Sequence, residues 1–226
     1  MPSFRFAATF SVLLTFLLCL SSCVDKDQGR GQLAGLKIAC LGDSITHGYK
    51  LANPAHESYP ARLGQQAHGR WHVLNFGVNG ATVLEKGDIP ITAQEEYQRA
   101  IQSEPDVVVV MLGTNATKNI NWQHIGEFVG DYTVLLKKFQ SLPSKPHVIV
   151  CSIPPVFANY PNGITAQHEE KINILVKKIA VSAGTDFLDI YTSVSQEPSL
   201  FVDGVHPNAR GAEKIASLVF SKISSL

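Results

Sequence analysis

The sequence lacks an excess of charge of either sign. Its 226 residues include 19 lysines and arginines and 19 aspartates and glutamates, so the formal net charge at pH 7 is zero. Proteins that hold nucleic acid through its phosphates carry a surplus of basic residues. This balance of charges therefore predicts that the protein does not bind nucleic acid.

Cysteine is also scarce, and metal-ligand spacings are missing. Cys19 and Cys23 lie near the N-terminus, and Cys40 and Cys151 lie inside apolar runs, where two buried free thiols are expected. A disulfide between Cys40 and Cys151 is the alternative for an exported protein. The eight histidines show no H-E-x-x-H or similar spacing, so the sequence predicts neither a metal nor another cofactor.

The chain has little long apolar sequence outside its N-terminus. There, Arg5 is followed by an apolar run to Leu20, too short to span a bilayer comfortably and typical of a signal peptide over residues 1–22. L-S-S-C at residues 20–23 resembles the bacterial lipobox, which implies lipidation of Cys23; a plain secretory signal is the alternative. Residues 23–35 then read as a polar tether. The expected location is the bacterial cell envelope, with a lipid anchor facing the periplasm or the cell surface.

From Leu36 to the end, apolar runs alternate with helical patterns, as in one α/β domain (36–226) with a parallel sheet covered by helices on both faces. The runs V-V-V-V-M-L and V-I-V-C-S-I lack polar alternation, which indicates strands buried on both faces. Expected strands are 36–41, 73–76, 106–112, 147–153 and 186–190. Expected helices are about 59–68, 93–103, 122–139, 165–183 and 208–221, the last with Asn208 as its N-cap.

Four loops carry clusters of small polar residues: G-D-S-I-T, N-F-G-V-N-G-A-T, G-T-N-A-T-K and F-V-D-G-V-H-P-N. In such a sheet, these loops converge on one rim. Each cluster alone has a plain structural explanation. Asp43 or Ser44 can cap a helix, Gly77 and Gly80 can form a turn, Asn115 can be a turn residue, and Asp203 with His206 can belong to a surface loop.

Together, and in this order, the four clusters resemble the SGNH branch of the GDSL esterases, from about Ile38 to Ile215. The resemblance implies a three-layer α/β/α fold with a flavodoxin-like, five-stranded parallel sheet. It implies that Ser44 is the nucleophile and that Asp203 and His206 complete a catalytic triad. It also implies an oxyanion hole formed by the backbone N–H groups of Ser44 and Gly80 and the side-chain amide of Asn115.

The chemistry of these residues agrees with the roles. A serine hydroxyl is a poor nucleophile at neutral pH and needs a base such as His206 within hydrogen-bonding distance. Asp203, three residues earlier, can accept from the other ring nitrogen and favour the imidazolium that forms. Fixed donors must face the negative oxygen of the tetrahedral intermediate. Asp43 is expected to brace the turn, and His47 to have a surface or capping role.

One position departs from the family. Its third block usually reads G-T-N-D, whereas Ala116 follows Asn115 here. The acid is not a triad member in the family, so the chemistry is expected to survive. The bracing of the Asn115 loop is what the change puts in question.

The predicted function is a serine esterase that acts through an acyl-enzyme. Candidate rim loops 49–58, 84–91, 117–122, 156–163 and 195–202 mix polar with aromatic residues, which suits a sugar better than a fatty chain. With export, this resembles bacterial carbohydrate O-acetylesterases, so the expected partner is a small-molecule or glycan ester. Alternatives are a lysophospholipase, thioesterase or arylesterase of the same fold, or a non-catalytic glycan-binding module. A nucleotide binder is excluded because G-D-S-I-T is too short and acidic to cradle phosphate.

Overall fold

Five parallel strands form the centre of the domain. The computed structural model describes residues 1–3, 35–160 and 162–226. Its strands are β1 (Leu36–Gly42), β2 (Trp71–Gly77), β3 (Val107–Met111), β4 (His147–Cys151) and β5 (Asp186–Leu188), in the order β2-β1-β3-β4-β5. β1 pairs with both β2 and β3, so that Ile38 lies opposite Val73 on one side and Val107 on the other. The predicted five-stranded, flavodoxin-like sheet is confirmed.

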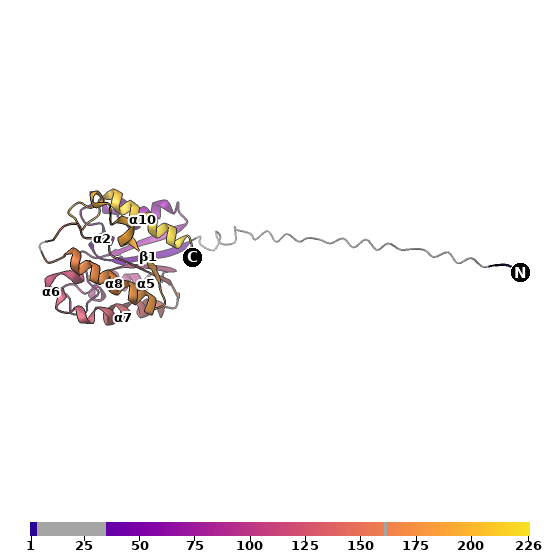
Figure 1. Cartoon of the computed structure of the whole chain (residues 1–226), viewed down its shortest axis with the longest axis horizontal. Coiled ribbons are helices and arrows are strands. Elements are labelled where there is room, and N and C mark those ends of the chain that lie inside the picture. The colour runs from indigo at the N-terminus through magenta and orange to yellow at the C-terminus, as the bar shows by residue number, and fades with distance from the viewer. Residues whose placement is uncertain (4–34, 161) are drawn as a thin grey trace. The chain divides into compact units, whose positions relative to one another are not determined.

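Helices cover both faces of this sheet, as the unbroken apolar strands predict. Alternate residues of β1 belong to two cores: Ile38 and Cys40 to one, Ala39 and Leu41 to the other. The first core is closed by α4 (Tyr59–Gln66), α9 (Ile190–Val194) and α10 (Ala209–Ile223), and the second by α5 (Glu95–Gln102), α7 (Phe128–Gln140) and α8 (Ala166–Ser182). Figure 1 shows α10 on one side of the sheet and α5, α7 and α8 on the other. The three-layer α/β/α fold is thus confirmed.

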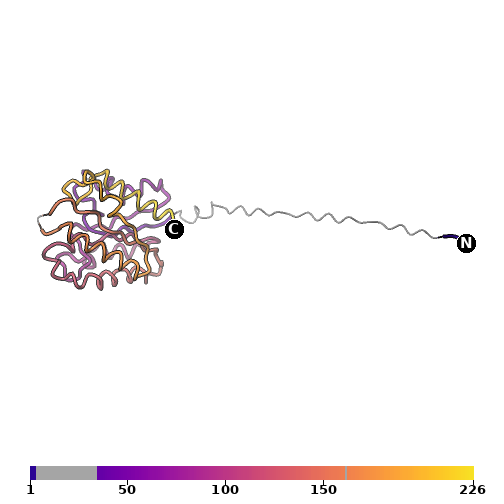
Figure 2. Tube along the Cα trace, viewed as in Figure 1, coloured from indigo at the N-terminus to yellow at the C-terminus, as the bar shows by residue number. Residues whose placement is uncertain are grey.

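Helix α10 illustrates how local sequence and packing agree. The side chain of Asn208 accepts hydrogen bonds from the backbone N–H groups of Arg210 and Gly211, which confirms the expected N-cap. Ile215 and Val219 are buried on the face that packs against the sheet. In Figure 2 the yellow trace of α10 lies on the same side of the domain as the purple trace of α4, which it contacts.

Two expected elements differ from the structure. The helix expected at 122–139 begins only at Phe128, because α6 (Asn119–Trp122) and the 3-10 helix η3 (Ile125–Glu127) precede it as separate turns. The strand expected at 186–190 ends at Leu188. There, the Asp189 side chain accepts from the backbone N–H of Thr192 and caps α9.

The two domain cysteines, Cys40 and Cys151, are buried and free, as expected. Burial raises the pKa of the Cys40 thiol to about 12, which keeps it in the unreactive protonated form. Among the described residues, no helix has the length and apolar character needed to cross a membrane. Nearly all of the predicted signal peptide and tether, including the predicted lipidation site Cys23, lies outside the described residues.

The strand order also predicts where a ligand binds. Along the sheet, β1 is followed on one side by β2 and on the other by β3, so the connections leave β1 and β3 toward opposite faces. In open α/β sheets the crevice at the carboxyl ends of two such strands is the usual binding site. The loops that carry Ser44 and Asn115 begin at this place.

Candidate active site

Ser44 lies directly after β1, at the first position of the one-turn helix α2 (Ser44–His47). The chain can turn there because Gly42 has no side chain: a Cβ at this position would lie 2.7 Å from the carbonyl oxygen of Met111. Asp43 caps α2, its Oδ1 accepting a hydrogen bond of 3.0 Å from the backbone N–H of Ile45. The predicted bracing of this turn by Asp43 is confirmed. Asp43 caps the helix, and Ser44 at the same time lines the cavity described below.

His206 reaches Ser44 from the other end of the chain. Its Nε2 lies 2.9 Å from Ser44 Oγ, and its Nδ1 lies 2.9 Å from Asp203 Oδ2. With Nδ1 donating to the carboxylate, Nε2 is free to accept from the serine hydroxyl. The structure therefore brings Ser44, His206 and Asp203 into one hydrogen-bonded chain.

The loop that carries the acid and the imidazole is held by its own backbone. Asp203 Oδ1 accepts from the N–H groups of His206, at 2.8 Å, and Val205, at 3.1 Å. The N–H of Val202 donates to the His206 carbonyl oxygen at 2.8 Å, closing the loop. Gly204 has φ of 82° and packs so closely on Ala158 that a Cβ there would lie 2.7 Å from the alanine Cβ.

These contacts set the charge on Asp203. Partial burial by itself would raise the pKa of this carboxyl, but hydrogen bonds from the Lys50 ammonium, from the backbone and ring of His206 and from the Val205 N–H outweigh it and lower the pKa. Asp203 is consequently a carboxylate throughout the pH range in which an imidazole works as a base. A permanent negative charge beside His206 favours the imidazolium that forms when the imidazole takes a proton.

The predicted oxyanion donors face the same place. Gly80 has φ of 81°, in the left-handed region that favours glycine, and its backbone N–H donates to no acceptor within the described part of the chain. Asn115 Nδ2 donates to the Ala81 carbonyl oxygen at 3.0 Å and lies 3.4 Å from Asp43 Oδ2. These contacts hold the Asn115 side chain in place, and Asn115 lines the same cavity as Ser44 and Gly80.

A cavity of about 290 Å³ connects these groups. Besides Ser44, His206, Gly80 and Asn115, its lining includes Tyr49, Asn79, Lys118, Tyr160 and Asn162. The convergence of the four polar loops on one rim is thereby confirmed. Tyr49 and Tyr160 both present rings to His206, at centroid distances of 4.9 and 5.8 Å.

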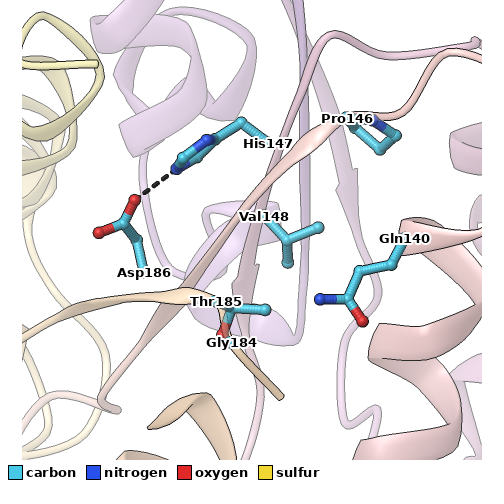
Figure 3. Close-up of a pocket in the computed structure, with 7 residues that line it drawn as sticks. All are labelled: Gln140, Pro146, His147, Val148, Gly184, Thr185 and Asp186. Carbon is cyan, nitrogen blue, oxygen red and sulfur yellow. Dashed lines mark hydrogen bonds and ion pairs between the residues drawn. The ribbon is translucent and has the colours of Figure 1, made fainter.

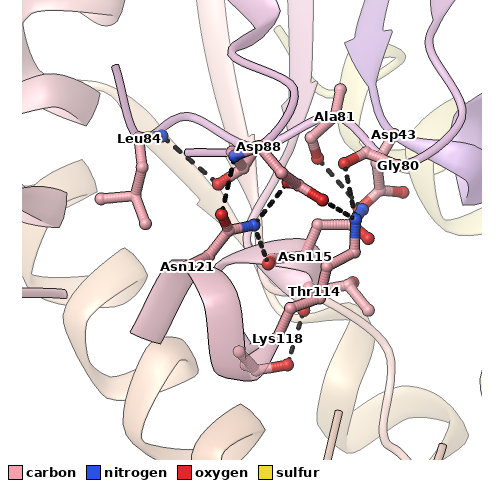
Figure 4. A network of polar contacts seen from close by, with 11 residues as sticks. Asp43, Gly80, Ala81, Leu84, Asp88, Thr114, Asn115, Lys118 and Asn121 are labelled. Atoms are coloured by element: carbon pink, nitrogen blue, oxygen red, sulfur yellow. Dashed lines mark hydrogen bonds and ion pairs between the residues drawn. The ribbon is translucent and has the colours of Figure 1, made fainter. Parts of the chain in front are cut away.

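A network of three side chains connects the loops that carry the two predicted oxyanion donors, Gly80 and Asn115 (Figure 4). Lys118 Nζ lies 2.9 Å from Asp88 Oδ2 and donates to the Gly80 carbonyl oxygen at 3.2 Å. Asn121 Nδ2 donates to Asp88 Oδ1 at 2.7 Å and to the Asn115 carbonyl oxygen at 2.8 Å. We call Asp88, Lys118 and Asn121 the clasp, since they connect the loop of Gly80 to that of Asn115.

The comparisons with known proteins agree with this geometry. The sequence model of the GDSL-like lipase/acylhydrolase family matches residues 40–214. The chain belongs to this family.

Curated relatives are longer than this chain. An acetylxylan esterase of Xylanibacter ruminicola is 32% identical over 207 residues, which cover 83% of this chain and 43% of the relative. A multidomain esterase of Ruminococcus flavefaciens is 29% identical over 122 residues, or 53% of this chain and 16% of the relative. The chain thus spans less than half the length of the curated relatives that it matches.

Solved structures of family-like hydrolases share the fold. A carbohydrate acetylesterase from Sinorhizobium meliloti superposes with a TM-score of 0.69 at 18% identity, covering 84% of this chain and 99% of that one. An acetylxylan esterase from Geobacillus stearothermophilus gives 0.66 at 20%, covering 84% and 94%. An aryl esterase of M. smegmatis gives 0.71 at 20%, covering 85% and 100%. At sequence identities this low, the structural similarity shows a shared fold and carries no further conclusion.

The clasp answers the question raised by Ala116, where the family usually has an acid. Ala116 is fully buried and cannot donate or accept through its side chain. The Asn115 loop is instead braced by Asn121, which is itself fully buried and donates to the Asn115 carbonyl oxygen. From the sequence, Asp88, Lys118 and Asn121 lie only within candidate rim loops, 84–91 and 117–122, and no bracing role was predicted for them.

Several other rim candidates lie away from the cavity. Trp122 stacks on His168 with centroids 3.8 Å apart, and Phe157 packs against Phe201 at 5.1 Å. Asn79, from the second polar cluster, and Asn162, from the candidate rim loop 156–163, do line the cavity, although neither was singled out by residue from the sequence. His47 is exposed at the end of α2 and its Nδ1 lies 3.3 Å from the Gly77 carbonyl oxygen, as expected for a surface or capping residue.

A cavity of about 310 Å³ lies at the opposite edge of the sheet, where β4 and β5 begin (Figure 3). His147 and Asp186 point toward one another there and form a hydrogen bond, and Lys222 Nζ lies 2.5 Å from Asp186 Oδ1. This arrangement ties β4, β5 and α10 together. Over residues 35–160 and 162–226 there is no group of three or more histidine, cysteine or acidic side chains that could hold a metal ion.

Proposed function

We propose that the chain is a serine esterase that hydrolyses O-acetyl groups on a carbohydrate. One observation carries the proposal: Ser44 Oγ, His206 Nε2 and Nδ1, and Asp203 Oδ2 form a continuous hydrogen-bonded chain, each link 2.9 Å long, at the floor of a cavity. This is the geometry that activates a serine hydroxyl for acyl transfer.

The reaction follows from the arrangement in two halves. Ser44 Oγ attacks the ester carbonyl carbon while His206 Nε2 takes the hydroxyl proton, and the carbonyl oxygen becomes an oxyanion that faces the N–H groups of Ser44 and Gly80 and the Asn115 amide. The intermediate collapses, His206 gives its proton to the leaving alcohol, and an acyl-serine remains. Water, deprotonated by His206 Nε2, then attacks the acyl-serine, and when the second tetrahedral intermediate collapses, His206 returns the proton to Ser44 Oγ and the acid is released.

Cavity size and lining support a short acyl group on a polar alcohol. The cavity of about 290 Å³ is small for a fatty chain, and its wall combines amides of Asn79 and Asn162 with the rings of Tyr49 and Tyr160. Amides can hydrogen-bond sugar hydroxyls, and aromatic faces pack against sugar C–H groups. The matching proteins from Xylanibacter ruminicola and Sinorhizobium meliloti are described as acetylxylan and carbohydrate acetylesterases.

Acetate release tests the proposal. Purified protein is incubated with acetylated xylan and a panel of acetylated mono- and oligosaccharides, and free acetate is measured. We expect acetate release by the wild type and none above background by Ser44→Ala. Labelling of Ser44 by a fluorophosphonate tests the nucleophile without a natural substrate.

Two outcomes would favour the alternatives. Faster hydrolysis of aryl octanoates than of aryl acetates would point to a lysophospholipase, thioesterase or broad arylesterase. Polysaccharide binding with hydrolytic rates that Ser44→Ala leaves unchanged would point to a glycan-binding module.

We also propose that the chain is an envelope lipoprotein, anchored through Cys23 and joined to the domain by the tether at residues 23–35. The apolar run up to Leu20 and L-S-S-C at residues 20–23 support this proposal. Such an anchor places the esterase where polymeric glycans are accessible.

A further inference from the structure

The backbone that leaves α2 takes an unusual conformation beside the triad. Gly48 ends the helix with φ of 93°, and two residues later Lys50 has φ of 67°. Glycine adopts this left-handed region freely, whereas lysine does so at a cost and infrequently. A strained residue next to a reactive site is a reason to ask what its side chain does.

The Lys50 side chain points to the acid of the triad. Its Nζ lies 2.8 Å from Asp203 Oδ2, the same oxygen that accepts from His206 Nδ1 at 2.9 Å. The preceding residue, Tyr49, places its ring 4.9 Å from the His206 ring in an edge-on contact. Two consecutive residues thus touch the two members of the acid–base pair.

The same segment is fastened to the nucleophile. The backbone N–H of Tyr49 donates to the Ser44 carbonyl oxygen at 2.9 Å, and that of Gly48 donates to the same oxygen at 3.0 Å. Residues 48–50 therefore link the turn that carries Ser44 to the loop that carries Asp203 and His206, a second connection besides the hydrogen bond from Ser44 to His206.

We propose that Lys50 is a positioning residue that acts through Asp203 on the proposed triad. Its ammonium fixes the carboxylate oxygen to which His206 is bonded, which holds the imidazole ring toward Ser44. Its positive charge also disfavours a second positive charge on His206 in the resting enzyme. The inference rests on the proposed esterase function.

The charged and titratable groups that face the Asp203–His206 pair come from three parts of the fold. Asp43 and Tyr49 lie at the two ends of the α2 turn, Tyr160 comes from the loop before α8, and Lys50 lies on the outer side of Asp203. Of these, Lys50 is the cation in direct contact with Asp203. Removing it changes the charge at the pair without touching Ser44 or His206.

Three variants separate charge, side-chain geometry and backbone strain. Lys50→Met keeps much of the stem and removes the charge, Lys50→Arg keeps a charge that can reach the carboxylate, and Lys50→Gly removes the side chain while relieving the left-handed backbone. Lys86→Met is the matched control, because Lys86 forms a similar ion pair of 2.7 Å with Glu127 on the exposed surface.

Hydrolysis of 4-nitrophenyl acetate is measured from pH 5 to 9, together with thermal unfolding. For Lys50→Met and Lys50→Gly we expect kcat at pH 7 to fall about 3- to 10-fold with KM nearly unchanged, and the acidic limb of the kcat/KM profile to move up by about half a pH unit. Lys50→Arg restores most of the rate and the position of the limb. Lys50→Gly has an equal or higher melting temperature, and Lys86→Met behaves as the wild type.

The possible failures are distinct. Suppose that the wild type hydrolyses the ester, and that Lys50→Met and Lys50→Gly have the same kcat and the same acidic limb of the pH profile as the wild type. Lys50 then has no positioning role. If the variants lose activity only in proportion to a lower melting temperature, with an unmoved limb, the ion pair is merely structural and the inference is wrong. If the wild type neither hydrolyses esters nor reacts with a fluorophosphonate, the proposed function fails and the inference fails with it.

Discussion

Asp203 uses both of its carboxylate oxygens within the site: Oδ1 accepts from backbone N–H groups of its own loop, and Oδ2 from His206 and Lys50. The backbone bonds fix where the carboxylate lies, and the remaining oxygen can then decide which nitrogen of His206 carries the proton. A single carboxylate therefore sets both the position and the tautomer of the base.

Asp203→Asn is expected to lower kcat by about 10³- to 10⁴-fold while the fold is retained, because an amide nitrogen facing Nδ1 favours the wrong tautomer. Initial rates with 4-nitrophenyl acetate measure the effect, and circular dichroism checks the fold. Asp131→Asn is a suitable control, since Asp131 accepts from the Glu85 N–H at the surface. A rate within a few fold of the wild type would exclude Asp203 from the proposed triad.

Asp43 makes a prediction about stability. Burial raises the pKa of its carboxyl from 3.8 to about 6, against the opposing effects of the Ile45 N–H and the His206 charge. The folded protein thus binds this proton more tightly than the unfolded chain does. As pH rises from about 4 to 6, ionisation of Asp43 lowers the free energy of unfolding, and above pH 6 the cost is complete.

We therefore expect the unfolding free energy of Asp43→Asn, relative to that of the wild type, to increase by up to about 3 kcal/mol between pH 4 and 7. Asparagine keeps an oxygen that can accept from Ile45, so the cap survives. Urea unfolding at a series of pH values measures the difference. A difference independent of pH would show that the buried carboxyl is not the cause.

At the scale of elements, the clasp explains how two loops from different strands stay aligned. Asn121 in α6 bonds to Asp88, from the loop after β2, and to Asn115, from the loop after β3. Each contact adds a hydrogen bond to a polar group that Lys118 also contacts, so that the two loops share one connected network. The short helix α6 and the interrupted start of α7 follow from this arrangement.

Asn121→Ala is expected to destabilise the fold by about 2 to 4 kcal/mol, because it removes the hydrogen bonds that the buried Asn121 amide makes to the Asn115 carbonyl oxygen and to Asp88. We also expect kcat to fall about 10-fold, since Gly80 and Asn115 lose their alignment. Gln123→Ala is the matched control: its side chain makes an exposed hydrogen bond to the Ile120 carbonyl oxygen. Equal effects of the two substitutions on melting temperature and kcat would contradict the role of the clasp.

The elements differ in how well their sequence predicts them. The ends of β3 and α10 were predicted within two residues. An uninterrupted run of valines predicts a buried strand, and a capped, amphipathic stretch predicts a surface helix. The helix at 122–139 was placed too early. Residues 119–127 carry helical propensity, but contacts with the loop after β2 divide them into short turns, and such contacts leave no local pattern.

At the scale of the whole chain, the proposed lipid anchor can be tested separately from the activity of the domain. If Cys23 is lipidated, the full-length protein produced in a bacterial host incorporates an alkyne-tagged fatty acid and sediments with membranes. Cys23→Ala is expected to lose both properties. Cys19→Ala, which changes a cysteine of the preceding apolar run, is expected to keep them, and labelling of Cys23→Ala equal to that of the wild type would contradict the proposed anchor.

The sequence by itself determined the layered α/β fold and the identity of Ser44, Gly80, Asn115, Asp203 and His206 as candidates. It could do so because apolar periodicity sets the elements, and because the four loop motifs, in their order along the chain, resemble those of the SGNH branch of the GDSL esterases. Only the tertiary structure decided that Lys50 touches Asp203, that the clasp replaces a local brace beside Ala116, and that Tyr49 and Tyr160 rather than Trp122 face the cavity. Those contacts join residues far apart in the chain, and they depend on where packing places each loop, which no local pattern of residues encodes.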